Sequence, residues 1–87
     1  MFVKFSNHSK IQMLARGTDE SEVIESIEDG QWQQAKDNKL HSSKTFLFKS
    51  ISPVNKQFYN FKTVDSIFVK ENSEIIVVTV KVFYHNE

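Results

Sequence analysis

Residues 6–30, SNHSKIQMLARGTDESEVIESIEDG, decide the fold of this chain, because they carry two helix signatures in direct succession. Ser6 offers a side-chain oxygen that can cap a helix beginning near Asn7. Arg16 suits the negative C-terminal end of that helix, and Gly17 supplies a left-handed stop after about ten residues. The apolar positions recur at i, i+3 and i+4 and predict one buried stripe: Ile11, Leu14 and Ala15, with Met13 beside it.

The second helix begins almost at once. Asp19 as N-cap, with Glu22 three residues later, is a variant of the capping box, and acids suit the positive end of a helix. Gly30 provides the stop. The apolar stripe consists of Val23, Ile27 and, less centrally, Ile24. Because only two or three residues connect the helices, the pattern predicts a tight helical hairpin.

After residue 30 the hydrophobic period changes to that of strands. Residues 44–49 alternate around two phenylalanines, and residues 58–61 lead into a β-branched run at 64–69. Turn signals fall at 36–39, 52–55 and 71–74. Residues 75–84 predict the longest strand, with Ile76, Val78, Val80 and Val82 on one face and Thr79 and Lys81 on the other.

A chain in which helices are followed by a run of strands is typical of the α+β class. We expect residues 1–87 to form a single α+β domain, with the N-terminal helical hairpin packed on a four-stranded antiparallel sheet. Hydrophobicity alternates weakly along residues 2–5. This pattern fits either a short edge strand or a lead-in that packs on the sheet.

Composition narrows the class of protein. Formal net charge is zero, yet residues 19–29 hold six acids, and from residue 31 onward eight lysines face five acids. Such a charge distribution is typical of a solvated acidic helix with ordinary surface lysines. There is no cysteine, and the longest apolar run, at 75–78, is far too short for a bilayer, which predicts a cytoplasmic protein without membrane contact.

His8 and Arg16 are the candidate chemical groups of the first helix. They are eight residues apart, about 2.2 turns, so both point in similar directions about 12 Å apart and could line one edge of a groove against the sheet. Equally, His8 could be a polar residue packed on the sheet and Arg16 a cation that caps the helix. His41, expected in a polar loop, and His85, near the chain end, are too scattered for a metal site, and we expect no cofactor.

The last strand brings further candidates together. Thr79, Lys81, Phe83 and His85 share one face by their spacing, and Lys44, Tyr59 and Tyr84 could lie nearby. Acid–base cleavage of RNA needs a proton acceptor for the 2′-hydroxyl, a proton donor for the leaving oxygen and a cation for the phosphorane. These residue types could fill the roles, although any chain with 25% charged residues offers a similar set.

The opening FSNHS, followed after four residues by LARGTDESEV, resembles the opening motif F-S-x-H-A-x-x-R-M-x-x-R-G-I-(S/T)-x-x-x-V of the domain-of-unknown-function family 4258, and the ending IVVTV resembles its closing strand. That family is similar in layout to the barnase, colicin and RelE-like ribonuclease toxins, which place helices over a four-stranded antiparallel sheet. The resemblance implies that His8 is an acid or base, Arg16 a phosphate anchor and Thr79 a third catalytic residue. Gln12 stands where the motif has an arginine, so one cation is missing from the implied phosphate groove.

Two functions therefore stay open. The first is a metal-independent endoribonuclease toxin, with His8, Arg16 and Thr79 as catalytic residues and Lys44, Lys81 and Tyr84 as binding residues for RNA. The second is a non-catalytic module that binds a protein, such as an antitoxin, immunity or phage accessory protein, and it draws on the neutral charge, the acidic second helix and Gln12.

Overall fold

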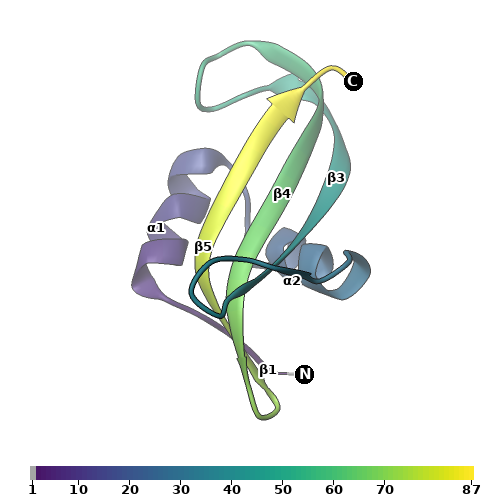
Figure 1. Ribbon diagram of the computed structural model, residues 1–87. Coiled ribbons are helices and arrows are strands. Elements are labelled where there is room, and N and C mark those ends of the chain that lie inside the picture. The colour runs from purple at the N-terminus through teal and green to yellow at the C-terminus, as the bar shows by residue number, and fades with distance from the viewer. Residues whose placement is uncertain (1) are drawn as a thin grey trace.

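The computed structural model describes residues 2–87. The elements in chain order are β1 (Phe2–Phe5), α1 (Asn7–Arg16), α2 (Glu20–Asp29), β2 (Gln33–Gln34), β3 (Leu40–Ile51), β4 (Phe58–Glu71) and β5 (Glu74–His85). Figure 1 shows the long, twisted strands β3, β4 and β5, with α1 beside β5 and α2 near β3 and β4. No helix in residues 2–87 is long and apolar enough to cross a membrane.

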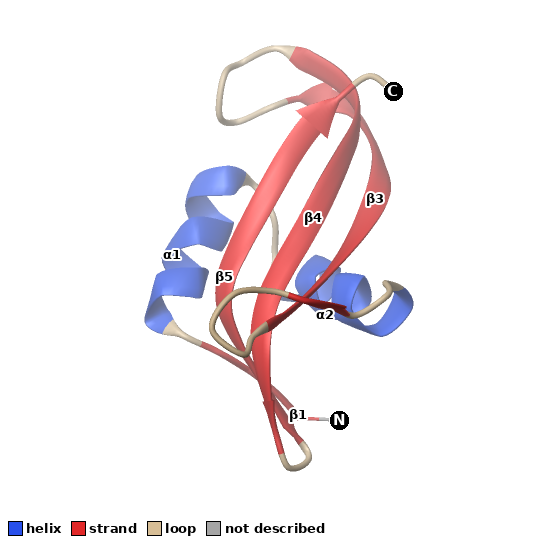
Figure 2. Ribbon diagram, viewed as in Figure 1, coloured by secondary structure: helices blue, strands red, loops and turns tan. Residues whose placement is uncertain are grey.

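The sheet has five strands in the order β1-β5-β4-β3-β2, and Figure 2 shows the long hairpins that build its centre. The predicted α+β class is confirmed, but the prediction of a four-stranded, wholly antiparallel sheet is wrong. Residues 2–5 form a strand that runs parallel to β5, pairing Phe2 with Glu74 and Phe5 with Val77. A parallel neighbour needs a crossover connection, which the two helices and the β3–β4 hairpin supply here.

One face of the sheet carries the core. Along β4 the residues Val64, Ser66 and Phe68 are fully buried, while the residues between them are only half-buried. The buried apolar cluster combines both helices with β4 and β5: Met13, Val23, Ile27, Val64, Phe68, Ile75, Val77 and Val80. Trp32 closes one end, with its ring edge-on to Phe68 at 5.1 Å and its indole N–H donating to the Ile27 carbonyl. We call this side the covered face.

A bulge in β5 changes which of its residues face the core. Phe68 pairs with Val77 but Ile67 pairs with Thr79, so Val78 is an extra residue on β5. The bulge puts Val77 and Val80 on the same face. The predicted stripe is therefore right for Val80 and Val82 but wrong for Ile76 and Val78, because strict alternation does not survive an inserted residue.

The two helices do not form the predicted hairpin. α1 packs against β5, whereas α2 packs across β3 and β4, and the junction between them is tied to the sheet instead. The ammonium of Lys62, on β4, donates to the Gly17 carbonyl at 2.8 Å and pairs with Glu22 at 2.7 Å. The helix bounds agree with the prediction, since the side chains of Ser6 and Asp19 cap α1 and α2.

The predicted burial of α1 is wrong, whereas that of α2 is right. Val23 and Ile27 of α2 are fully buried, but Ile11 and Leu14 of α1 are 65% and 86% exposed. α1 instead buries Ser9 and Met13. Its polar side chains face the sheet because β1 pairs with β5 only as far as Val77, and the backbone beyond that point needs other partners.

Candidate functional site

The side of the sheet opposite the helices is uncovered, and we call it the open face. Residues paired across strands share a face, as do alternate residues along one strand. The register therefore places successive rows on the open face: His41–Ile67–Thr79, Ser43–Asp65–Lys81, Thr45–Thr63–Phe83 and Leu47–Phe61–His85. None of these residues is buried, whereas their neighbours on the covered face of β4, residues 62, 64, 66 and 68, all are.

A histidine–aspartate pair lies at one end of the open face. The Nδ1 atom of His41 lies 3.2 Å from Oδ1 of Asp65, and the two side chains are 33% and 18% exposed. A carboxylate accepts hydrogen bonds and does not donate them, so Nδ1 carries the proton of a neutral His41 and Nε2 carries the free lone pair. The pair therefore presents an oriented proton acceptor.

Polar groups surround this pair on the adjacent strands. Lys81 and Ser43 are the cross-strand partners of Asp65 on β5 and β3. Thr79 lies in the row of His41, across Ile67. Neighbouring strands are about 4.8 Å apart and residues rise about 3.4 Å along a strand, so His41 and Lys81, two strands and one row apart, are separated by about 12 Å of sheet. Such a span fits a phosphodiester and its flanking sugars between a base and a cation.

The other end of the open face is aromatic and hydrogen-bonded. Thr63 shares hydrogen bonds of 2.8 Å with Thr45 and with Nε2 of His85. The His85 ring stacks on Phe61, with centroids 5.8 Å apart and an interplanar angle of 25°. The side chain of Phe83 is 53% exposed beside them. An exposed ring next to a stacked pair offers π-surfaces to a flat ligand.

The structure divides the predicted site residues between the two sides of the sheet. Thr79 and Lys81 lie on the open face with Phe83 and His85, as their spacing predicts. Arg16 lies on the helix side, where its Nη1 atom donates to the Val80 carbonyl at 2.7 Å. Arg16, which the resemblance implies to be a phosphate anchor, thus already has a backbone partner on the helix side.

The remaining predicted residues are also on the helix side. His8 is exposed in the first turn of α1. Lys44 pairs with Asp29 at 2.6 Å and Glu25 at 3.3 Å, and the hydrogen bond to Asp29 is the main cause that raises the pKa of Lys44. Tyr84 donates to the Arg16 carbonyl at 2.6 Å, and burial, with a smaller effect of Glu22, raises its pKa. Lys44 and Tyr84 thus hold the helices in place.

His41 and Asp65 were missed by the sequence analysis. The prediction that His41 lies in a polar loop is wrong, because β3 begins at Leu40, well before the Phe-rich segment that marks it. One signal was present: acids are depleted in strands, and Asp65 interrupts a run of β-branched and aromatic residues. Among residues 2–87, no group of three or more histidine, cysteine or acidic side chains is placed to hold a metal ion.

No family model, curated protein or solved structure matches the chain.

Proposed function

We propose that the protein is a metal-independent endoribonuclease whose active site is the open face of the sheet. The observation that carries this proposal is the His41–Asp65 pair, which orients an imidazole on an uncovered surface next to Lys81. The site differs from the one that the sequence motif implies, because Arg16 is already bound to a backbone carbonyl. Thr79 and Lys81, which the sequence predicts as a catalytic and a binding residue, both lie on this face.

The chemistry is an internal transesterification of RNA. Nε2 of His41 accepts the proton of a ribose 2′-hydroxyl, whose oxygen attacks the adjacent phosphorus. The bond from phosphorus to the 5′-oxygen breaks, a 2′,3′-cyclic phosphate forms, and the leaving oxygen takes a proton from the Lys81 ammonium. Before that transfer, the ammonium stabilises the charge that develops on the phosphorane. Solvent restores both groups to their starting protonation states.

The aromatic end of the open face supports a single-stranded substrate. Bases of single-stranded RNA bind by stacking on exposed rings, and each such contact contributes about 1–3 kcal/mol. Phe83 and the stacked pair of Phe61 and His85 are one or two rows from Asp65 along the strands. A nucleotide next to the scissile bond can therefore stack there while its phosphate lies between His41 and Lys81.

The test is cleavage of a defined single-stranded RNA in excess EDTA, with a variant of His41 compared with a variant of His8. We expect His41→Ala to lose about 10²–10⁴-fold in rate, which is the usual contribution of a general base. His8→Ala is the matched control, since His8 is exposed on α1 and should keep the wild-type rate. Product analysis should find a 2′,3′-cyclic phosphate.

Two further variants separate loss of chemistry from loss of folding. Asp65→Asn keeps the shape of the side chain but no longer fixes the protonated Nδ1, so cleavage should fall while thermal unfolding stays near wild type. Equal rates for wild type and His41→Ala would exclude this site. A wild-type protein that cuts no RNA would exclude the enzyme and leave the non-catalytic binding module.

A further inference from the structure

A chain of hydrogen bonds crosses the aromatic end of the open face, from a histidine ring to an exposed hydroxyl. Nδ1 of His85 lies against the backbone carbonyl of Glu87, and Nε2 of His85 lies 2.8 Å from the Thr63 hydroxyl. The Thr63 hydroxyl lies 2.8 Å from the hydroxyl of Thr45, whose side chain is exposed. The chain of hydrogen bonds therefore ends at the solvent.

The carbonyl at the inner end gives this chain of hydrogen bonds its direction. A carbonyl only accepts, so Nδ1 of a neutral His85 carries the ring proton and Nε2 is an acceptor. Thr63 then donates to Nε2, and because a hydroxyl has a single proton, Thr63 accepts from Thr45. The proton of Thr45 is thus used within the chain of hydrogen bonds, and the Thr45 oxygen presents only lone pairs to a ligand.

An aromatic surface lies next to this acceptor. Phe61 is the cross-strand partner of His85 on β5 and of Leu47 on β3. The His85 ring stacks on Phe61, with centroids 5.8 Å apart, and so covers the ring face that is turned toward β5. The other ring face is turned toward β3, where Leu47 is 68% exposed and Thr45 lies two residues away along the strand. A flat base that extends the stack there has its edge beside the Thr45 oxygen.

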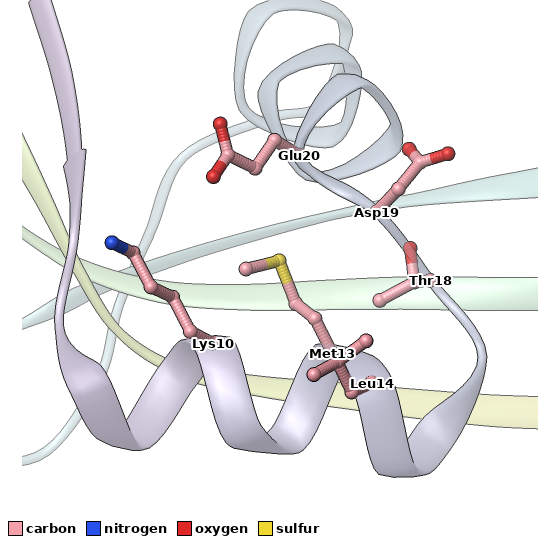
Figure 3. A pocket seen from close by; sticks show the side chains of 6 residues that line it. All are labelled: Lys10, Met13, Leu14, Thr18, Asp19 and Glu20. Atoms are coloured by element: carbon pink, nitrogen blue, oxygen red, sulfur yellow. The ribbon is translucent and has the colours of Figure 1, made fainter.

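Another recess of the size of a base lies on the helix side, between α1 and the start of α2. It has a volume of about 290 Å³ and is lined by Lys10, Met13, Leu14, Thr18, Asp19 and Glu20. Figure 3 shows Asp19 and Glu20 on the α2 side of this cavity. Their two carboxylates outnumber the single ammonium of Lys10, and the Thr18 hydroxyl already donates to Glu22. The cavity therefore offers a nucleotide an excess of negative charge, which repels its phosphates.

We propose that Thr45 selects for bases that carry an exocyclic amino group. The amino group of adenine, cytosine or guanine donates to the Thr45 oxygen while the base stacks on the free face of Phe61. Uracil is disfavoured, because its one N–H lies between two carbonyl oxygens, and these oxygens repel an acceptor. The proposal rests on the proposed function for the class of ligand, single-stranded RNA, and adds which of its bases bind.

The test measures the binding of two oligonucleotides that differ only in an amino group. Both are 2′-O-methyl RNAs, which the proposed reaction cannot cut, and they carry adenine or unsubstituted purine at every position. In fluorescence anisotropy, the wild-type chain should bind the adenine probe about fivefold more tightly, which is the effect of one neutral hydrogen bond. Equal binding of the two probes would overturn the proposal.

Two variants of Thr45 assign the preference to its hydroxyl. Thr45→Val keeps the shape of the side chain but removes the oxygen, so this variant should bind both probes equally. Thr45→Ser is the matched control, because it keeps the hydroxyl and should keep the preference for adenine. A preference that survives in Thr45→Val would overturn the proposal.

A variant of His85 tests the direction of the hydrogen bonds. His85→Phe keeps a ring that can stack on Phe61 but removes the acceptor at Nε2. Thr63 is then free to donate to Thr45, whose own proton turns outward, and the preference for adenine should fall below about twofold. An unchanged preference would mean that His85 does not orient Thr45, and would overturn the proposal.

A variant on the helix side locates the base. Leu14→Ser changes the cavity between α1 and α2 and should leave both affinities unchanged. Weaker binding of both probes to this variant would place the base in that cavity and overturn the proposal.

Binding and cleavage separate this proposal from the proposed function. A wild-type chain that prefers the adenine probe but cuts no RNA in EDTA would exclude the enzyme and support the base site. A chain that binds neither probe would overturn the base site, and cleavage of RNA by the same chain would still support the enzyme.

Discussion

The two helices have nearly the same design but use it in opposite ways. α1 and α2 are each ten residues long, each has a side-chain N-cap, and each is followed by a glycine. α2 turns Val23 and Ile27 into the core, whereas α1 turns Leu14 out to solvent. Similar amphipathic patterns therefore do not determine which side of a helix meets the sheet.

The difference follows from what each helix covers. α2 lies over the face of the sheet at β3 and β4. There the Ser26 hydroxyl shares a hydrogen bond with the Ser66 hydroxyl, and the Ser26 carbonyl accepts one from the Ser42 hydroxyl. α1 lies along the edge of β5, where the backbone N–H of Val80 donates to the Gln12 side chain and the Val80 carbonyl accepts from Arg16. Both helices hydrogen-bond to the sheet, but α2 also buries Val23 and Ile27 on its face, whereas α1 buries only Met13 among its apolar residues and binds the backbone of the β5 edge.

The largest expected effect on stability comes from truncating one side chain in the predicted apolar stripe of each helix. Ile27→Ala should lower the free energy of unfolding by about 2–5 kcal/mol, because it leaves a cavity in a fully buried site. Leu14→Ala should change it by less than about 0.5 kcal/mol, because Leu14 is exposed. Urea unfolding followed by tryptophan fluorescence measures both. Similar losses for the two variants would show that α1 buries its stripe in solution.

The glycines after the helices should differ for a related reason. An added Cβ at Gly30 would lie 2.5 and 2.7 Å from the backbone oxygens of Ser26 and Ser43, so Gly30→Ala should cost about 3 kcal/mol through overpacking. Gly17 has φ +81°, and a Cβ there would lie 2.5 Å from the Tyr84 hydroxyl and 2.6 Å from the Pro53 ring, which are side-chain and not backbone atoms. Gly17→Ala should cost about 1–2 kcal/mol.

These two variants are compared by thermal unfolding at one protein concentration. A smaller loss for Gly30→Ala than for Gly17→Ala would mean that the end of α2 can move away from β3, contrary to the close approach described above.

A substitution at Gln12 tests whether α1 stabilises the edge of β5 by hydrogen bonding. Gln12→Leu removes the acceptor for the backbone N–H of the fully buried Val80 and should cost about 1–3 kcal/mol. Gln31→Leu, at an exposed position, is the control and should be near neutral. Hydrogen exchange at the Val80 amide should also become faster in Gln12→Leu. Unchanged exchange would assign the protection of that amide to packing rather than to Gln12.

The sequence predicts the local parts of this fold well. Both caps and both helix ends are right, because a cap depends on a few neighbouring residues such as Ser6 and Asp19. The orientation of α1 is not predicted, since it depends on where β1 stops pairing with β5, more than sixty residues away along the chain. The bulge at Val78 is likewise set by the pairing of β4 with β5.

The residues of the candidate site likewise include some that the sequence predicts and some that it does not. The shared face of Thr79, Lys81 and His85 is predictable, because these residues are an even number of positions apart on one strand and side chains alternate between its faces. The His41–Asp65 pair joins residues 24 positions apart on two strands. Its formation depends on the β3–β4 register, which no short stretch of sequence contains.

The smallest expected effects on stability come from removing the side chains of the two N-cap residues. Ser6→Ala and Asp19→Ala each remove the side-chain acceptor for a backbone N–H in the first helical turn, and each should cost about 1 kcal/mol at pH 7. The hydrogen bond from the Glu22 backbone N–H is the main cause that holds the pKa of Asp19 below its ordinary 3.8. Only Asp19 can therefore lose its effect by protonation.

The sign of the pH dependence follows from that lowered pKa. A carboxyl group with a lowered pKa in the folded state stabilises the fold above its unfolded-state pKa, and this contribution is lost as the pH falls through the folded-state pKa. The stability difference between wild type and Asp19→Ala should thus shrink on acidification, while the difference for Ser6→Ala stays constant. Urea unfolding at neutral pH and below pH 3 measures both differences. A difference for Asp19→Ala that persists in acid would mean that Asp19 acts by the shape of its side chain and not by its charge.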